Sequence, residues 1–188
     1  MGNQAKIILI CVFLNVTMVC LVLIVFCLFH MNKMDEYNEI TNYSTYKREL
    51  VNNTDVHSKL VIFPDKIDEK NVIDFQYLKE DGLFDGAYLF YLAIDYDKDL
   101  FLKEANRIKE LHTIYDDTIL SFPTYLTILD GYGTYEYVIL DEEDDKIIYI
   151  FNQLLDWSKT KIEKDYILQE ENINKKLIGY NTYIDNDS

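Results

Sequence analysis

The sequence has little of what disulfide-rich, metal-binding or nucleic-acid-binding proteins require. Its 188 residues include only three cysteines, two prolines and six glycines, and 18 basic side chains stand against 33 acidic ones. The cysteines (Cys11, Cys20 and Cys27) all lie near the start, so the remainder offers no disulfide framework, thiolate nucleophile or cysteine-based metal site. The formal net charge of −15 argues against nucleic acid as a partner, because phosphate binding requires a basic patch.

Sequence motifs of common enzyme classes are also missing. The chain contains no P-loop, no G-x-G-x-x-G turn, no H-E-x-x-H helix and no G-x-S-x-G elbow. Its three histidines, His30, His57 and His112, lie far apart in the sequence and form no set. We therefore predict neither a cofactor nor a catalytic residue.

An uncharged apolar run near the start is the strongest positive signal. Residues 7–29 contain no charged side chain, and 17 of these 23 residues are Leu, Ile, Val or Phe. As a helix the run is roughly 35 Å long, against about 30 Å of bilayer hydrocarbon, and its insertion is favoured by about 5–10 kcal/mol. We predict a short cytoplasmic tail at residues 1–6 and a transmembrane helix at 7–31 that binds membrane lipid.

Other interpretations of this run fail on particular residues. A cleaved signal peptide needs small residues at its exit, and residues 27–31 read CLFHM. A lipoprotein cysteine needs small residues before it, whereas Phe26 precedes Cys27. Myristoylation after Met1-Gly2 needs Ser or Thr where Lys6 stands. The run is therefore predicted to be an uncleaved anchor, and the very short tail before it favours an extracytoplasmic domain after it.

The rest of the chain divides by composition. Residues 32–58 are polar and lack sustained periodicity, which is typical of a stem or linker. Residues 59–170 have the apolar content of an acidic folded domain, and residues 171–188 resemble a flexible C-terminal tail.

Short apolar segments within 59–170 predict an α+β fold. Ala87 to Ile94 is apolar, short and bounded by Gly86 and Asp95, as expected of a strand buried on both faces. The predicted order is ββαβββ, an antiparallel sheet packed on one helix. We expect strands at 60–63, 87–94, 125–129, 135–140 and 147–151, with a helix at 97–113. Residues 67–80 fit either a short strand or an amphipathic turn.

The helix at 97–113 has clear start and face signals. Asp97 can cap its free N–H groups, and Phe101, Ala105 and Ile108 form an apolar stripe at three-to-four spacing, with Arg107 pointing away from it. One sheet face can pack on this stripe. The other face needs a second cover or a protein partner.

The order of aromatic and turn residues in this region carries a resemblance. Leu111 to Asp117, Phe122-Pro123-x-Tyr125, Tyr135-Glu136-Tyr137 and Ile148-Tyr149-Ile150 resemble a group of small anchored extracytoplasmic proteins of Gram-positive gut bacteria. In that group a similar strand–helix–meander follows a membrane helix or lipid anchor. The resemblance implies a location and a fold over residues 59–168, and it implies no activity.

Carboxylates and tyrosines supply the only candidate sites. Five carboxylates in one predicted hairpin loop are weak candidates for binding a cation: Asp141, Glu142, Glu143, Asp144 and Asp145. Glu136 would become a functional candidate if it faced the core, although an edge or solvent position is favoured.

Tyrosine is unusually frequent, with 16 in the chain. Tyrosines offer rigid amphipathic contact area, so those on the predicted meander form a candidate interaction face: Tyr125, Tyr135, Tyr137 and Tyr149. Codon bias explains the frequency at least as well, because Ile, Asn and Asp are abundant too.

Two functional hypotheses follow from these features. The first is a single-pass membrane protein whose acidic extracytoplasmic domain acts as a binding or accessory module. The second is a surface hydrolase without a recognisable motif, which requires two carboxylates converging in a pocket, at least one of them with a shifted pKa.

Overall fold

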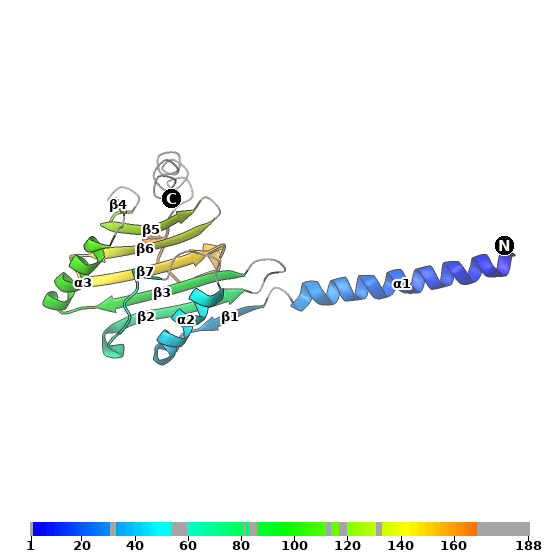
Figure 1. Ribbon diagram of the computed structural model, residues 1–188, viewed down its shortest axis with the longest axis horizontal. Coiled ribbons are helices and arrows are strands. Elements are labelled where there is room, and N and C mark those ends of the chain that lie inside the picture. Colours follow the sequence, from blue (N-terminus) through cyan, green and yellow to red (C-terminus); the bar gives the residue numbers. More distant parts are fainter. Residues whose placement is uncertain are drawn as a thin grey trace.

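A long N-terminal helix and a sheet domain make up the structure (Figure 1). The computed structural model describes residues 2–30, 33–53, 60–80, 82, 86–111, 114–116, 120–130 and 133–168. Helix α1 (Asn3–His30) extends away from the domain, which begins with strand β1 (Met34–Tyr37). Four short 3-10 helices complete the helical content of the described residues: η1 (Ile40–Asn42), η2 (Glu69–Asn71), η3 (Trp157–Lys159) and η4 (Lys164–Tyr166).

The domain is built on one seven-stranded sheet in which every pair of neighbouring strands is antiparallel. The strand order is β1-β2-β3-β7-β6-β5-β4. After β3, helix α3 (Lys98–Glu110) takes the chain to the far edge, and the β4–β7 meander returns until β7 pairs with β3. The remaining strands are β2 (Val72–Glu80), β3 (Ala87–Asp95), β4 (Ile114–Asp116), β5 (Thr124–Asp130), β6 (Thr134–Asp141) and β7 (Lys146–Gln153).

The α+β class, the strand at 87–94, the meander and the helix are confirmed. Asp97 caps α3 as expected, because its Oδ1 accepts a hydrogen bond from the Leu100 N–H at 2.9 Å. Phe101, Ala105 and Ile108 are buried against the sheet, so the apolar stripe faces the core.

The predicted stem is wrong over its described residues, 33–53, which belong to the folded domain. Strand β1 pairs with β2, and helix α2 (Tyr43–Asn53) packs on the sheet with Tyr43 and Leu50 2% and 0% exposed. The helix was missed because it offers few apolar residues among charged ones. The predicted boundary at residue 59 therefore falls inside the domain.

The predicted element order is also wrong in detail. Residues 60–63 are not a strand, β1 and β4 are additional strands, and the domain uses helices α2 and α3 rather than one helix. Helix α3 ends at Glu110, three residues before the predicted end at 113, and the additional strand β4 follows at Ile114–Asp116. The predicted tail at 171–188 lies outside the described residues.

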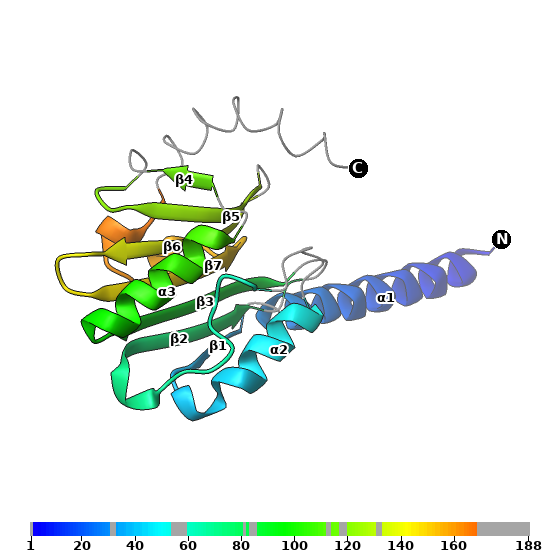
Figure 2. The same ribbon diagram turned by 60° about the vertical axis from the view of Figure 1, so that its left-hand side comes forward.

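Both faces of the sheet are covered by the chain itself (Figure 2). The first face lies under α2, α3 and residues 60–65, which we call the strap. The second face lies under residues 155–168, which we call the C-terminal cover. Along β3 alternate residues face alternate covers: Phe90 packs on the first face and Leu89 on the second. The second cover is thus part of the chain, and the sheet needs no partner to bury it.

A buried asparagine starts the C-terminal cover. Asn152, 1% exposed, accepts a hydrogen bond from the Leu155 N–H at 3.1 Å and donates one to the Leu155 carbonyl at 3.0 Å. Leu154 between them has a left-handed backbone with φ of 58°, which turns the chain back beneath β7. Farther along, the Tyr137 hydroxyl donates to the Tyr166 carbonyl at 2.8 Å and fixes the end of the cover.

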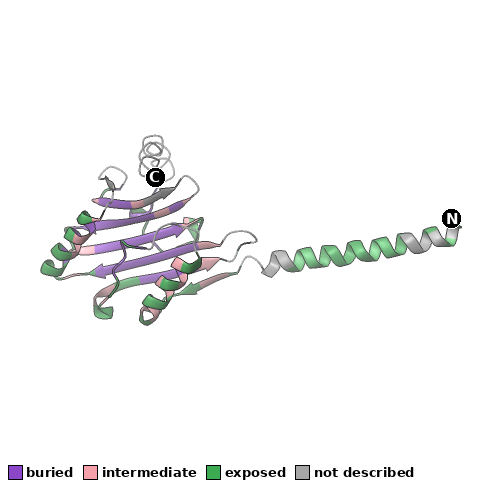
Figure 3. Ribbon diagram, in the orientation of Figure 1, coloured by how far each residue is buried: buried purple, intermediate pink, exposed green. Residues whose placement is uncertain are grey.

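Helix α1 differs from every other element in its exposure (Figure 3). Its large apolar side chains from Ile10 to Phe26 are 49–68% exposed, whereas the sheet strands are largely buried. Among the residues that the structure describes, no helix is both long enough and apolar enough to cross a membrane.

Candidate functional site

The four candidate tyrosines do not form one exposed face. Tyr137 and Tyr149 are 0% exposed and Tyr125 is 8% exposed. Tyr125 and Tyr149 pack in the core on the first face, whereas Tyr137 packs on the second, with Tyr135 partly buried beside it. These side chains fill both cores of the domain, so they offer no common surface to a partner.

The five hairpin carboxylates are not gathered around a cation site. Asp141 is buried and lies 3.5 Å from Lys146 Nζ, and Asp145 turns the hairpin with a φ of 49° while its carbonyl accepts the Tyr96 N–H. Among the described residues, which include all five carboxylates, no group of three or more potential ligands converges. The exposed members of the loop are Glu142, Glu143 and Asp144.

Glu136 lies in the core, so the solvent or edge position favoured from the sequence is wrong. It is 0% exposed on β6, an inner strand between β5 and β7, and is paired in register with Ile128 and Phe151. Its side chain shares the first face with Val138, because both alternate with Tyr137 on the second face. An inner strand with two covered faces leaves no solvent side for a carboxylate.

The most connected polar group on the first face centres on Glu104 of α3. Its Oε1 accepts hydrogen bonds from Tyr149 Oη at 2.7 Å and Arg107 Nη2 at 2.6 Å, and its Oε2 accepts one from Arg107 Nε at 2.8 Å. The Tyr96 hydroxyl lies 3.4 Å from that of Tyr149. Burial raises the pKa of Tyr149 well above its ordinary range, so the phenol remains a hydrogen-bond donor.

This group holds the strap across the sheet. Arg107 Nη1 and Nη2 donate to the carbonyls of Val61 and Ile62 at 3.1 and 2.6 Å. From the other side, helix α2 supplies Lys47 Nζ to the Phe63 carbonyl at 3.0 Å and the Tyr43 hydroxyl to the Pro64 carbonyl at 2.7 Å. Side chains of the two helices therefore satisfy the strap carbonyls that a neighbouring strand would bind in a sheet.

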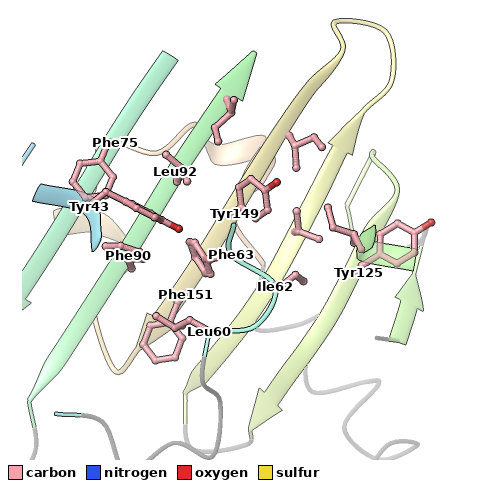
Figure 4. Close-up of a cluster of buried hydrophobic side chains, with 14 of the residues drawn as sticks. Tyr43, Leu60, Ile62, Phe63, Phe75, Phe90, Leu92, Tyr125, Tyr149 and Phe151 are labelled. Atoms are coloured by element: carbon pink, nitrogen blue, oxygen red, sulfur yellow. The ribbon is translucent and has the colours of Figure 1, made fainter. Parts of the chain in front are cut away.

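The side chains of the strap explain its misleading sequence pattern. Leu60, Ile62 and Phe63 are almost fully buried in the cluster that Figure 4 shows. Val61 between them is 50% exposed. The Phe63 ring lies 5.2 Å from that of Phe90, and Leu60 adopts a left-handed φ of 51° that no regular strand allows. The apolar run is real, but it packs as an irregular segment on the sheet rather than as a strand within it.

Because Arg107 donates two hydrogen bonds to the strap, we expect its substitution to destabilise the domain. Arg107→Leu removes two donors to the strap and leaves Glu104 without its cation, so the free energy of unfolding should fall by about 1.5–3 kcal/mol. Urea unfolding measures this, with the exposed substitution Lys103→Leu on the same helix as the matched control. Adding Glu104→Gln should recover part of the loss, because it removes the uncompensated charge. Equal stabilities of wild type and Arg107→Leu would contradict the assigned role.

A second polar group joins the C-terminal cover to edge strand β1 through hydrogen bonds. Glu36 of β1 accepts hydrogen bonds from Lys161 Nζ at 2.6 Å, Asn38 Nδ2 at 3.0 Å and Gln76 Nε2 at 3.3 Å. The hydrogen bonds from Lys161 and Asn38 are the main reason why the pKa of Glu36 is lowered from 4.5 to about 2. Lys161 also completes a Ser-x-x-Lys pattern with Ser158, but its bond to Glu36 gives it a structural role.

Glu36 gives the domain a predictable acid sensitivity. A carboxyl with a lowered folded-state pKa stabilises the fold above its unfolded pKa, and that contribution is lost as the pH falls from about 4.5 through about 2. Glu36→Gln should therefore lower the urea midpoint slightly at neutral pH, and the difference from wild type should vanish near pH 2. The exposed Glu142→Gln is the control, and it should leave the urea midpoint at neutral pH unchanged.

Comparisons of the chain with protein-family models, curated proteins and solved structures found no match. Sequence reasoning missed the Glu104 group, although the Glu-x-x-Arg spacing on one helix is a signal for it. The strap partners Lys47 and Tyr43 had no signal, because they lie in the predicted stem.

Proposed function

We propose that the protein is a single-pass membrane protein in which α1 is the anchor and the acidic domain is an extracytoplasmic binding or accessory module. The observation that carries this proposal is the exposure of α1 on all sides: its large apolar side chains from Ile10 to Phe26 are 49–68% exposed. Water would have to solvate that whole surface, whereas lipid would cover it. The uncharged run of the sequence extends this segment on both sides, from Ile7 to Phe29.

The polar side chains of α1 are compatible with hydrocarbon. Thr17 Oγ1 donates to the Phe13 carbonyl at 2.8 Å, and Asn15 Nδ2 donates to the Cys11 carbonyl at 2.8 Å. Polar groups in a bilayer core have no water to bind, so bonds back to the helix backbone reduce their cost. This pattern supports the anchor.

The negative charge of the domain favours protein partners over anionic lipid. Lys6 is the only charged side chain before Lys33, so 33 acidic and 17 basic side chains follow the helix, a net charge of −16. Such a domain is repelled by anionic headgroups and attracts basic surfaces. We infer that its partners present basic surfaces, and the resemblance to anchored extracytoplasmic proteins agrees with this location.

The hydrolase hypothesis receives no comparable support. Both carboxylate oxygens of Glu104, the carboxylate of the most connected group, already accept hydrogen bonds from Arg107 and Tyr149. Glu36 is held by Lys161 in the same way. A general base or nucleophile needs a free oxygen directed at a substrate, and these carboxylates hold the fold together instead.

Fractionation and protease shaving of cells test the proposal. We expect the full chain to remain in the membrane pellet after sodium carbonate extraction, and its domain to be digested when intact cells are treated with protease. Release by carbonate would contradict the anchor. A domain that survives shaving but is cut in lysates would contradict the extracytoplasmic orientation and leave the anchor standing.

A further inference from the structure

Asn15 lies inside the uncharged run of α1, and its hydrogen-bonding capacity is only partly used among the described residues. The Thr17 hydroxyl is satisfied by the carbonyls of Phe13 and Leu14, at 2.8 and 3.0 Å. The Asn15 carboxamide, which offers two donors and one acceptor oxygen, makes a single hydrogen bond among the described residues, to the Cys11 carbonyl. One N–H and the oxygen remain available.

In a membrane, the position of Asn15 would give its unsatisfied polar groups a high free-energy cost. It lies three residues from Met18, the midpoint of the uncharged run 7–29, which places it roughly 4.5 Å from the bilayer centre along the helix. A short carboxamide at that depth cannot reach the interface. Polar groups of this kind in a bilayer are commonly satisfied by a neighbouring helix.

The residues around Asn15 form a stripe suited to helix pairing. Spacings of four and three residues alternate along it, which is the a/d pattern of a two-stranded coiled coil with asparagine at one a position. The stripe consists of Cys11, Asn15, Met18, Val22 and Val25. Cys20 lies about two and a half turns from Cys11 and therefore on the opposite side of the helix.

We propose that α1 pairs with α1 of a second copy of this chain, in parallel and across this stripe. The inference rests on the proposed role of α1 as the anchor, because both copies then insert with the same end first. In a parallel pair related by twofold symmetry Asn15 faces Asn15, and a carboxamide complements its own copy because it both donates and accepts. The available N–H of one copy binds the available oxygen of the other.

Cross-linking through the native cysteines tests the pairing face in the full chain. The Cys20→Ala/Cys27→Ala variant keeps only Cys11, and the Cys11→Ala/Cys27→Ala variant keeps only Cys20. Oxidation of membranes with copper phenanthroline should convert the first variant to a covalent dimer of twice 22.3 kDa. The second should give at least fivefold less. Equal yields from both variants, or none from Cys11, would overturn the proposed face.

Substitution of Asn15 in the Cys11-only variant tests the carboxamide itself. Asn15→Leu removes the hydrogen bond while keeping an apolar side chain suited to lipid, and the dimer yield should fall roughly tenfold. Asn15→Gln keeps a carboxamide and should restore most of it. An unchanged yield with Asn15→Leu would overturn the role of Asn15.

Carbonate extraction of the same membranes separates this inference from the proposed function. A chain that stays in the pellet but gives no stripe-specific dimer overturns the pairing and leaves the anchor in place. A chain that is released by carbonate overturns the anchor, and the proposed pairing within the membrane falls with it.

Discussion

Replacing Val16 and Leu23 by arginine is expected to remove the chain from the carbonate-resistant membrane fraction. Each arginine near the centre of a membrane helix costs about 2.5–3.5 kcal/mol, and each also removes an apolar contribution. Together they oppose insertion by about 6–8 kcal/mol, which is comparable to the whole favourable free energy of the apolar run. Both positions lie away from the Asn15 stripe, so the substitutions change the apolar run without altering the stripe itself.

The control places the same charge on an exposed part of the domain. Leu100 and Leu102 of α3 are 44% and 50% exposed, and arginine at both should leave the chain in the membrane pellet. Western blotting of pellet and supernatant measures the distribution. If Val16→Arg/Leu23→Arg stayed in the pellet as wild type does, α1 would not be the element that holds the protein there.

Shortening Leu50 to alanine is expected to lower the free energy of unfolding by about 2–5 kcal/mol. Leu50 is 0% exposed in the core on the first face, although it lies in the segment predicted as a linker. Its loss leaves a cavity between α2 and the sheet. Urea unfolding followed through the single tryptophan, Trp157, measures the change, because Trp157 packs on the opposite face and reports loss of the whole fold.

Leu102→Ala is the matched control for Leu50→Ala. Leu102 is half exposed on α3, so its truncation should change the free energy of unfolding by no more than about 0.5 kcal/mol. A chain that begins at residue 59 should fail to fold, because it lacks β1 and α2. Equal stabilities for Leu50→Ala and Leu102→Ala would show that 33–53 is a stem after all.

The sequence predicted those elements whose formation is governed by local apolar pattern. Ala87 to Ile94 reads as a strand because both faces of β3 are buried, and α3 shows both its cap at Asp97 and its stripe. The C-terminal cover was not predicted, because its apolar residues follow no regular pattern. Leu155, Ile162 and Leu168 are spaced irregularly among charges, because a segment without helix or strand geometry has no period to display.

In the candidate site, too, local contacts could be predicted from the sequence and long-range contacts could not. The Glu104–Arg107 pair could be predicted from its spacing on one helix, but Tyr149 joins it from a strand 45 residues away. Such a contact depends on the β3–β7 pairing and on the position of α3, which only the folded chain provides. Conversely, the tyrosine face was predicted from composition, and composition cannot distinguish a surface tyrosine from a core one.

If α1 is the anchor, the short segment between α1 and β1 limits the distance between the domain and the bilayer surface. A linker over residues 32–58 would allow the domain to range up to roughly 90 Å from the lipid surface. With α1 ending at His30 and β1 beginning at Met34, the tether can span only about 13 Å. Edge strand β1 is then held almost at the headgroups. A partner that binds at this edge would therefore have to approach along the membrane surface.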